Sequence, residues 1–498
     1  MFETKAINNP IKSDYLKSMK NSISFVLDGN ITEIDFGKEY TPTTTVLNYL
    51  RKSPCHKGVK EGCAEGDCGA CTVVIAEAGE GNKMSYKAID SCLVFLPMLQ
   101  GKQLITVENL GLKTNSGTVL HPVQEAMVNC NGSQCGYCTP GIVMSLLALY
   151  KNEAKTSLDT VNDALTGNLC RCTGYKPIVE AAMKSCAKPQ PDVFSKSEGQ
   201  VAGMLHDLKA KQQSVSIRSG KQRYDQPLTK SEALVLRKES PDSILLSGAT
   251  DIALRVTKRQ ETLQHIIDLS QIEELKKIKE SEQEFRLGAG IDLETLRLYA
   301  EKQIPVLAET LAVFGSRQIR SLATLGGNLG SGSPIGDTLP TLMACNADII
   351  LESTNGERRV PMNKFLLAYR KTERRPDELI TAVIIPKPDK TNKLKFYKVS
   401  KRKDLDISTL SAGFSLRLRN NRVEAITLAY GGMAAVTKRA AAAEAFLTGK
   451  EWSRATVEEA MPLVASEFTP LSDARSGAAF RTLAAKNLLL KFWSETSQ

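Results

Sequence analysis

The sequence predicts a multidomain α+β protein, and three observations support that fold class. The chain has 498 residues, more than one hydrophobic core usually organises, so about three or four domains are expected. Strand-like and helix-like segments are interspersed: Asp28-Gly29 marks a hairpin between two alternating segments, and residues 43–52 have the apolar face of a helix. Ten of the 12 cysteines precede residue 173, which separates a cysteine-rich first third from the remainder.

Composition and charge exclude several classes of protein. Hydrophobic residues make up 42% of the chain and charged residues 24%, as in an ordinary globular protein. The net charge of +10 arises from basic residues spread along the chain, so no nucleic-acid partner is expected. The longest apolar runs, such as residues 142–150, are too short to cross a bilayer, and no membrane association is expected. Residues 1–18 lack the apolar region of a signal peptide, and we expect an unstructured extension of a cytoplasmic protein.

Four cysteines in a domain predicted over residues 21–110 have the spacing of an iron–sulfur site. Cys63, Cys68 and Cys71 are separated by four and two residues, and Cys92 follows later. In a cytosolic chain, clustered cysteines more often bind metal than form disulfides. The spacing is that of plant-type [2Fe–2S] ferredoxins, in which four thiolates hold two iron atoms.

Three glycines lie among these cysteines, namely Gly62, Gly66 and Gly69. Glycine permits the positive φ values that a loop needs in order to coil tightly around a cluster. It also lets backbone amides approach the sulfur atoms, which helps to set the reduction potential. The alternative is a structural zinc site. Zinc usually binds paired C-x2-C hooks, and the four-residue gap disfavours that interpretation.

Four more cysteines lie in a helical domain predicted over residues 118–187. Cys135 and Cys138 stand in a loop between two helical segments, and Cys170 and Cys172 precede a third. Helix N-termini carry partial positive charge, which stabilises thiolates and an anionic cluster. The two hooks can therefore hold a second iron–sulfur cluster, with zinc or a redox-active dithiol as the alternatives. The remaining cysteines show no ligand spacing and are expected to be structural: Cys55, Cys130, Cys186 and Cys345.

Two glycine-rich segments follow a polar linker predicted over residues 188–222, in which one short helix is expected over residues 201–211. Residues 245–252 form the end of a strand, a turn and the start of a helix, and residues 324–333 form a second loop with few large side chains. Such loops let backbone amides approach a phosphate, but ordinary tight turns have the same composition. Neither segment has the G-x-G-x-x-G pattern of a Rossmann site.

The cysteine motifs GSQCGYCTPG and NLCRCTGY resemble the helical cluster domain of the molybdenum hydroxylases, the family of xanthine dehydrogenase and aldehyde oxidase. LLSGATDIAL and RQIRSLATLGGNLGSGSPIGD resemble the FAD-contacting segments of the same family. The resemblance runs from about residue 21 to the C-terminus. It implies, in order, a β-grasp ferredoxin domain, an all-α four-helix domain, an α+β FAD-binding domain over residues 223–390 and an α+β C-terminal flavoprotein domain over residues 391–498.

The resemblance also implies which residues contact FAD. They are Leu245, Leu246, Ser247, Gly248, Ala249, Thr250, Asp251 and Ile252 in the first segment, Thr324, Leu325, Gly326, Gly327 and Asn328 in the second, and Phe314, Asp337, Ile380 and Lys398 elsewhere. Without the resemblance, Phe314 is equally a core aromatic residue and Asp337 equally a helix cap.

The basic segment over residues 399–409 matches a loop that lies beside the flavin ring in family members. Cationic charge there would favour the reduced flavin and attract dinucleotide phosphates, although a solvated charged turn has the same composition. Leu405 stands where some family members carry an acidic residue, which leaves the choice between NAD+ and oxygen as electron acceptor open.

The resemblance implies an electron-transfer subunit of a xanthine dehydrogenase. Electrons would pass from a molybdopterin centre on a partner subunit through two [2Fe–2S] clusters to FAD and on to NAD+, in the oxidation of hypoxanthine or xanthine. Single-chain family members continue into a molybdopterin domain after the flavin domain, and the given sequence does not. A large partner subunit that carries this domain is therefore expected. We expect a heterotetramer of two small and two large subunits. No catalytic side chain is expected in this chain, because the cofactors carry the reaction.

Other functions remain open at this stage. One is the corresponding subunit of another molybdenum hydroxylase, which oxidises aldehydes or N-heterocycles. A second is a free-standing NADH-linked reductase, which the helical cluster domain disfavours because that domain has little purpose unless it faces a pterin. A third is a scaffold for iron storage or cluster assembly, which the two flavin segments disfavour.

Overall fold

The computed structural model describes residues 20–79, 81, 83–115, 117–152, 156–187, 189–389 and 391–497. The extension expected over residues 1–18 lies outside this range. The chain forms two compact units. The first unit comprises Met1–Ala233 and Asp242–Gln271, and the second comprises Leu234–Pro241 and Ile272–Gln498. Residues 242–271, which the sequence assigned to the FAD-binding domain, thus group with the N-terminal unit.

The first unit begins with a mixed five-stranded sheet in the order β2-β1-β5-β3-β4. The strands are β1 (Ser22–Leu27), β2 (Asn30–Asp35), β3 (Thr72–Ala78), β4 (Met84–Asp90) and β5 (Gln103–Ile105), and only β1 and β5 pair in parallel. The hairpin predicted at Asp28-Gly29 is confirmed, with φ values of 49° and 87° at the turn. Helix α2 (Val46–Lys52) begins later than expected because Thr45 caps it. Short helical turns η2 (Ser91–Leu93), η3 (Leu96–Leu99) and η4 (Val107–Asn109) complete the region.

A helical region follows the small hairpin β6 (Leu112–Thr114) and β7 (Gly117–Val119). Its helices are α3 (Pro122–Asn129), α4 (Thr139–Asn152), α5 (Leu158–Leu165) and α6 (Lys176–Cys186), and they pack against one another. Helix α4 is buried from Gly141 to Tyr150, as its apolar sequence predicts. The predicted order of helix, cysteine loop and helix is confirmed here.

The segment expected as a linker contains a long helix, α7 (Val193–Ala210), which packs on β1 and β3. Asp192 caps it, and Phe194 and Leu205 are buried in the same core as the helical region. These apolar residues are too widely spaced to stand out in a polar composition, which is why the sequence suggested only a short helix. The chain then enters a four-stranded sheet, ordered β10-β11-β9-β8.

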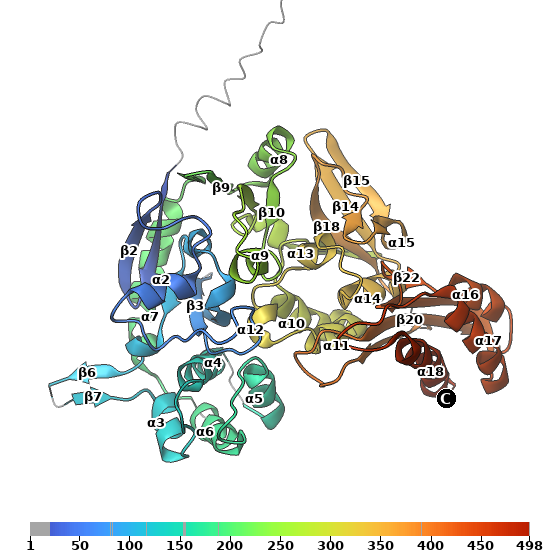
Figure 1. Cartoon of the computed structure of the whole chain (residues 1–498), viewed down its shortest axis with the longest axis horizontal. Coiled ribbons are helices and arrows are strands. Elements are labelled where there is room, and N and C mark those ends of the chain that lie inside the picture. The colour runs from blue at the N-terminus through green and yellow to red at the C-terminus, as the bar shows by residue number, and fades with distance from the viewer. Residues whose placement is uncertain are drawn as a thin grey trace, which may run out of the picture. The chain divides into compact units, whose positions relative to one another are not determined.

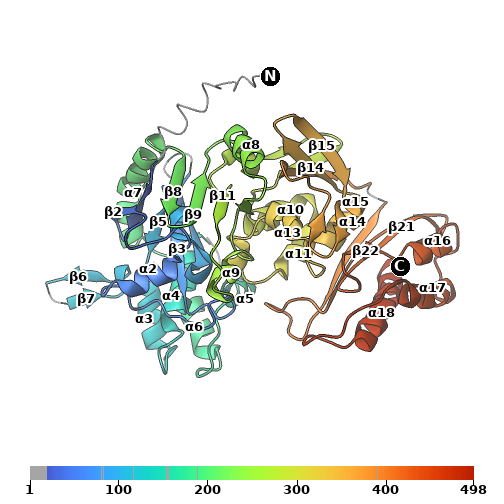
Figure 2. The same ribbon diagram turned by 45° about the horizontal axis from the view of Figure 1, so that its top comes forward.

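Figure 2 shows β8, β9 and β11 of this sheet side by side within the first unit. The strands are β8 (Val215–Ser219), β9 (Gln222–Gln226), β10 (Ile244–Leu246) and β11 (His265–Asp268), and the short helix α9 (Ala253–Thr257) lies between β10 and β11 in the chain. Helix α8 (Lys230–Glu239) contributes residues to both units.

The second unit contains a five-stranded antiparallel sheet in the order β12-β13-β18-β14-β15. Its strands are β12 (Ile278–Glu280), β13 (Glu284–Gly288), β14 (Asp348–Ser353), β15 (Gly356–Pro361) and β18 (Leu379–Pro386). The helical elements of this part are η5 (Glu273–Lys276), α10 (Leu293–Gln303), α11 (Pro305–Ala312), α12 (Arg317–Arg320), α13 (Leu325–Gly330), α14 (Thr338–Ala344) and α15 (Met362–Phe365). A small pair, β16 (Leu366–Ala368) and β17 (Lys371–Thr372), follows α15.

The C-terminal part of the second unit is an antiparallel sheet covered by helices, as Figure 1 shows for α16, α17 and α18. The strands are β19 (Lys393–Val399), β20 (Leu410–Arg419), β21 (Arg422–Gly431) and β22 (Lys438–Arg439); the helices are α16 (Ala441–Leu447), α17 (Arg454–Glu467) and α18 (Ala478–Thr496). Phe414, Trp452 and Phe492 lie in its core. Within the described part of the chain, no helix has the length and apolar character needed to cross a membrane.

Candidate functional site

The eight predicted cluster ligands stand in four hydrogen-bonded pairs of thiols. The pairs are Cys63 with Cys68, Cys71 with Cys92, Cys138 with Cys170, and Cys135 with Cys172. Among the described residues, no three metal-ligating side chains converge on a single-ion position. A [2Fe–2S] cluster has four thiolate ligands shared between its two iron atoms. Two pairs in each motif therefore fit one cluster of this kind per motif.

The first cysteine loop wraps its own sulfur atoms with backbone amides. Cys63 Sγ accepts hydrogen bonds from the amides of Glu65 and Asp67, at 3.4 and 3.3 Å. The hydrogen bond with Cys68, reinforced by these amides, lowers the pKa of the Cys63 thiol to about 5. The loop thus stabilises negative charge on sulfur, as a cluster ligand requires.

The glycines of this loop serve two different purposes. Gly66 and Gly69 have positive φ values of 79° and 66°, as predicted. Gly62 does not adopt a positive φ value, whereas Ala64 does, with φ of 56°. A Cβ atom on Gly62 would lie only 2.9 Å from Cys68 Sγ, so glycine is required there because the sulfur comes so close.

Asp90 is a buried carboxyl group beside this site that sequence reasoning missed. Cys71 Sγ lies 3.7 Å from its Oδ1, and its Oδ2 has no hydrogen-bond partner among the described residues. Burial, followed by the negative charge of Cys63, raises the pKa of Asp90 to about 8. An orphaned polar atom next to a cysteine pair fits a bound group in that space. In the sequence, the only signal for Asp90 is that it lies two residues before the predicted ligand Cys92.

The second cysteine motif has an outer and an inner pair of thiols. Cys135 and Cys172 are exposed, whereas Cys170 is buried and Cys138 is half-buried. Cys138 lies at the start of α4, where its carbonyl accepts from the amide of Ile142 at 3.0 Å. Burial, followed by the neighbouring Cys170, raises the pKa of the Cys138 thiol to about 12. One cluster held here would have one iron atom near the surface and one near the core.

The first predicted FAD segment forms the strand, turn and helix that its sequence predicts. Leu246 ends β10, Ala249 adopts φ of 62°, and the amide of Ala253 donates to Ala249 O at 2.8 Å to begin α9. At the other end of α9, Lys258 Nζ donates to Cys63 O at 3.0 Å. Helix α9 also packs against η2, the segment that contains Cys92. This candidate flavin segment therefore leads directly to the first cysteine loop.

The second predicted FAD segment lies in the second unit, where Thr324 caps α13. The amides of Leu325 and Gly326 donate to Ile291 O and Ala289 O, and Thr324 Oγ1 accepts from the amide of Gly327 at 3.1 Å. These amides already have acceptors. The segment can still contact a ligand through the exposed backbone at Gly327 and through the side chain of Asn328. Thr338 Oγ1 orients that side chain by donating a hydrogen bond to Asn328 Oδ1 at 2.5 Å.

Two further predicted FAD residues are brought together in the second unit. Asp337 is buried and accepts hydrogen bonds from Lys398 Nζ at 2.8 Å and from Ser408 Oγ at 2.5 Å. Lys398 Nζ also donates to Val313 O at 2.8 Å. Asp337 occupies the N-cap position of α14, as the helix-cap alternative expects, but its carboxylate accepts no capping hydrogen bond from the helix.

The remaining predicted FAD residues lie against the core of the second unit. Phe314 is half-buried and packs against this core, as expected of the core aromatic residue that was the alternative to an FAD contact. Ile380 is buried near α13, where a Cβ atom on Gly330 would lie 3.5 Å from its Cδ1. Thr381 was missed: its buried hydroxyl has no hydrogen-bond partner among the described residues, and no sequence motif marks it. An unpartnered hydroxyl at this position fits a polar ligand.

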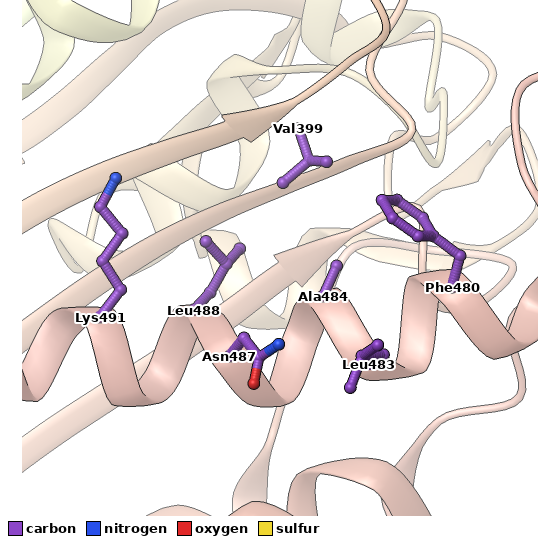
Figure 3. Close-up of a pocket in the computed structure, with 7 residues that line it drawn as sticks. All are labelled: Val399, Phe480, Leu483, Ala484, Asn487, Leu488 and Lys491. Atoms are coloured by element: carbon purple, nitrogen blue, oxygen red, sulfur yellow. The ribbon is translucent and has the colours of Figure 1, made fainter.

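An apolar pocket of about 430 Å³ lies between the end of β19 and helix α18. Figure 3 shows Val399 facing Phe480, Ala484 and Leu488 across it. Successive side chains of a strand point to opposite faces, so Val399 and Lys398 diverge. None of the predicted FAD residues lines this pocket.

Three protein-family models match successive parts of the chain. A [2Fe–2S] binding domain matches residues 106–183, the FAD binding domain in molybdopterin dehydrogenase matches residues 218–388, and the CO dehydrogenase flavoprotein C-terminal domain matches residues 395–496. These matches show a [2Fe–2S] binding domain, an FAD-binding domain and a C-terminal flavoprotein domain in this order along the chain. Both glycine-rich segments lie within the FAD-domain match, and Lys398 lies within the C-terminal match.

Full-length molybdenum hydroxylases resemble the chain along most of its length. Xanthine dehydrogenase of Emericella nidulans is 32% identical over 95% of the chain, and xanthine dehydrogenase/oxidase of Gallus gallus is 30% identical over 92%. Aldehyde oxidase 1 of Macaca fascicularis is 28% identical over 93%. The chain spans only 38–39% of the length of these curated relatives.

Solved molybdenum hydroxylase structures share the fold of part of the chain. Carbon monoxide dehydrogenase from Hydrogenophaga pseudoflava matches 55% of this chain with a TM-score of 0.52 and 26% identity. Quinoline 2-oxidoreductase from Pseudomonas putida 86 matches 55% with a TM-score of 0.51 and 25% identity. The match covers 96% of the solved chain in both cases.

Proposed function

We propose that this chain is the electron-transfer subunit of a xanthine dehydrogenase. In this proposal it receives electrons from a molybdopterin centre on a partner subunit, passes them through two [2Fe–2S] clusters to FAD, and reduces NAD+. Relatives named xanthine dehydrogenase, at 30–32% identity, support xanthine as the substrate.

The observation that carries the proposal is the serial arrangement of the cysteine pairs in the first unit. The pair Cys135–Cys172 is exposed, and the pair that contains Cys170 lies further inward. The amide of Leu169, next to Cys170, donates to Cys68 O in the first motif at 3.0 Å. The outer pair is accessible to an electron donor, and the inner pair adjoins the other cluster site. Electrons would therefore enter at the second motif and leave through the first.

The contact between the first cysteine motif and the candidate flavin segment supports the same direction of electron transfer. Helix α9, which follows the candidate flavin turn at residues 248–251, packs against the segment that holds Cys92. Lys258 at its end contacts the loop of Cys63 through both Cys63 O and Glu65, the latter at 3.3 Å. FAD held by this turn would therefore lie close to the first cysteine loop.

The side chains of this subunit hold and orient the cofactors. The eight cysteines supply thiolates, the loop amides stabilise their charge, and the predicted FAD residues bind the flavin. When bound, the clusters carry single electrons, and FAD exchanges electron pairs as hydride with a nicotinamide. The strand order of the first sheet, with α2 across it, is the arrangement we would expect for the proposed ferredoxin-like domain.

The molybdopterin centre is proposed to lie on a separate large subunit, in a complex of two small and two large subunits. The solved carbon monoxide dehydrogenase and quinoline 2-oxidoreductase chains, of which 96% matches part of this chain, support such a division into separate chains within the family. We place the complex in the cytoplasm, where thiols stay reduced.

A second candidate differs only in the substrate of the partner. Aldehyde oxidase 1 is 28% identical over 93% of the chain, and quinoline 2-oxidoreductase shares the fold of 55% of it. An aldehyde or an N-heterocycle therefore competes with xanthine as the compound oxidised. The electron-transfer role of this chain is the same in either case.

Co-expression of the chain with a molybdopterin-binding large subunit tests the proposal. Xanthine, an aldehyde and quinoline are offered separately, and NAD+ reduction is followed by absorbance. We expect xanthine-dependent reduction, together with about four iron atoms and one FAD for each copy of the chain. Vigorous NADH oxidation by the isolated chain, with no partner-dependent xanthine activity, would instead indicate a free-standing reductase.

A further inference from the structure

Asn168 lies between the two cysteine loops of the first unit and bonds to both of them. Its side chain is almost completely buried, with 2% of the residue exposed. Nδ2 donates to Gly69 O at 3.1 Å and to Thr72 Oγ1 at 3.2 Å, at the end of the first cysteine loop. Oδ1 accepts from Ser145 Oγ at 2.6 Å, on the helix that follows the second loop.

The orientation of this amide follows from its partners. Gly69 O is a carbonyl oxygen and only accepts, so the nitrogen of Asn168 must face it. Thr72 Oγ1 donates its own proton to Gly69 O at 2.7 Å and therefore accepts from Asn168. An aspartate at position 168 would place a carboxylate oxygen against that carbonyl, and the contact would become repulsive.

The next residue connects the two sets of cysteines directly. The amide of Leu169 donates to Cys68 O at 3.0 Å. Leu169 precedes Cys170, so one backbone hydrogen bond and one residue join a predicted ligand of each cluster. Asn168 strengthens this connection, because its side chain donates a hydrogen bond to Gly69 O, and Gly69 follows Cys68 in the chain.

The contact between the loops leaves no room for a methyl group. A Cβ atom on Gly69 would overlap Gly167 O and Asn168 Nδ2, and a Cβ atom on Gly141 would overlap Gly69 O. Protein interiors that are packed this tightly resist small displacements. The backbones of the two loops are therefore in direct contact, and the hydrogen bonds of the Asn168 side chain hold them in this arrangement.

We propose that Asn168 is a positioning residue that fixes the separation and relative orientation of the two clusters. This inference rests on the proposed function, since it requires a cluster in each motif. With clusters bound, Cys170 would hold the donor and Cys68 the acceptor of one electron; the donor cluster would be oxidised and the acceptor cluster reduced by that electron, with no atom or proton transferred. Electronic coupling falls steeply with separation, so a loosened contact slows the transfer.

The test compares Asn168→Asp with Asn162→Asp in the full-length protein. Asn162 lies in the same helical region but is exposed, so its variant makes the same chemical change away from the contact. Dithionite-reduced samples are examined by electron paramagnetic resonance for the number of cluster signals and for the magnetic interaction between them. The transfer rate is measured after a photochemically generated reductant injects one electron.

We expect Asn168→Asp to keep both cluster signals, weaken their magnetic interaction and slow the transfer severalfold, because electronic coupling falls with the distance between the clusters. Asn162→Asp should match the wild type. A purely structural role would lower the melting temperature without changing either quantity in cluster-loaded protein, and that result would overturn the inference.

A milder variant covers the case in which Asn168→Asp fails to load both clusters. Ser145→Ala removes the hydrogen bond to Oδ1 and leaves the amide donors of Asn168 in place. A weaker magnetic interaction in that variant supports the inference, and an unchanged interaction refutes it. Absence of two cluster signals from the wild-type protein would contradict the proposed function itself, which separates the two failures.

Discussion

Lys398 and Asp337 form a buried ion pair in the second unit, with Nζ 2.8 Å from Oδ2 and side chains that are 7% and 8% exposed. The pair joins β19 to the start of α14 across 61 residues of sequence. Val313 O and Ser408 Oγ provide further hydrogen bonds, so both charges are partnered. Removing one member leaves the other charge buried, which is far more costly than losing an exposed pair.

Lys398→Met is expected to destabilise the second unit by about 3–5 kcal/mol and to reduce its FAD content. Urea unfolding followed by tryptophan fluorescence measures this, because both tryptophans, Trp452 and Trp493, belong to that unit. Lys401→Met is the control, since Lys401 is exposed, and its effect should stay within about 0.5 kcal/mol. Equal stabilities of the two variants would contradict the prediction.

Thr324→Ala is expected to destabilise the second unit by about 1 kcal/mol through loss of the α13 cap. Because α13 carries the second candidate FAD segment, bound flavin should also fall, as measured by absorbance after gel filtration. Ser453→Ala is the matched control: Ser453 caps α17 and accepts from the amide of Thr456 at 3.3 Å. It should lose similar stability and keep its flavin. Equal flavin loss in both variants would show that the segment has no special role.

Glu294 gives the second unit a stability that depends on pH. Burial raises its pKa, but hydrogen bonds and charges from Arg297, Arg320 and Arg317 outweigh burial and lower the pKa to about 2. Arg320 Nε lies 2.6 Å from the carboxylate. The unfolded chain has a pKa of about 4.3 at this position, so the stabilisation is fully present above that pH and disappears as the pH falls toward 2.

The Glu294→Gln variant measures this contribution. It should be less stable than the wild type by about 3 kcal/mol at pH 7, and the difference should shrink below about pH 4. Urea unfolding at pH 7, 5 and 3 follows both proteins through the same tryptophan signal. A difference that stays constant across these conditions would mean that Glu294 acts by packing alone.

Cys172→Ser is expected to abolish one of two distinct cluster signals in electron paramagnetic resonance, with the flavin spectrum retained. Cys172 pairs with Cys135 in the exposed half of the second motif, and a serine hydroxyl does not replace its thiolate. Cys55→Ser is the control, because Cys55 is also exposed but belongs to none of the four pairs. Retention of both signals in Cys172→Ser would refute the ligand assignment.

Local signals in the sequence predicted much of the fold. The Asp28-Gly29 turn requires only the conformations of two residues, so composition and alternation predicted it correctly. The long apolar run of α4 likewise predicted a buried helix. Helix α7 was underestimated, because its few apolar residues reveal their purpose only when the core that buries them is known. The sequence likewise could not say which glycine of the first loop lies against a sulfur atom: Gly62 does so because Cys68 Sγ, six residues away, comes close to it.

The sequence by itself predicted the candidate ligands, namely eight cysteines in two motifs, and the two glycine-rich segments, because these features depend on residue type and spacing along the chain. Only the tertiary structure decided how the thiols pair, which pair faces solvent, and that Asp90 and Asn168 lie beside the two motifs. It also joined Lys398 to Asp337. These relationships depend on backbone segments 19 to 99 residues apart that meet through close packing and buried hydrogen bonds, and no local pattern records such contacts.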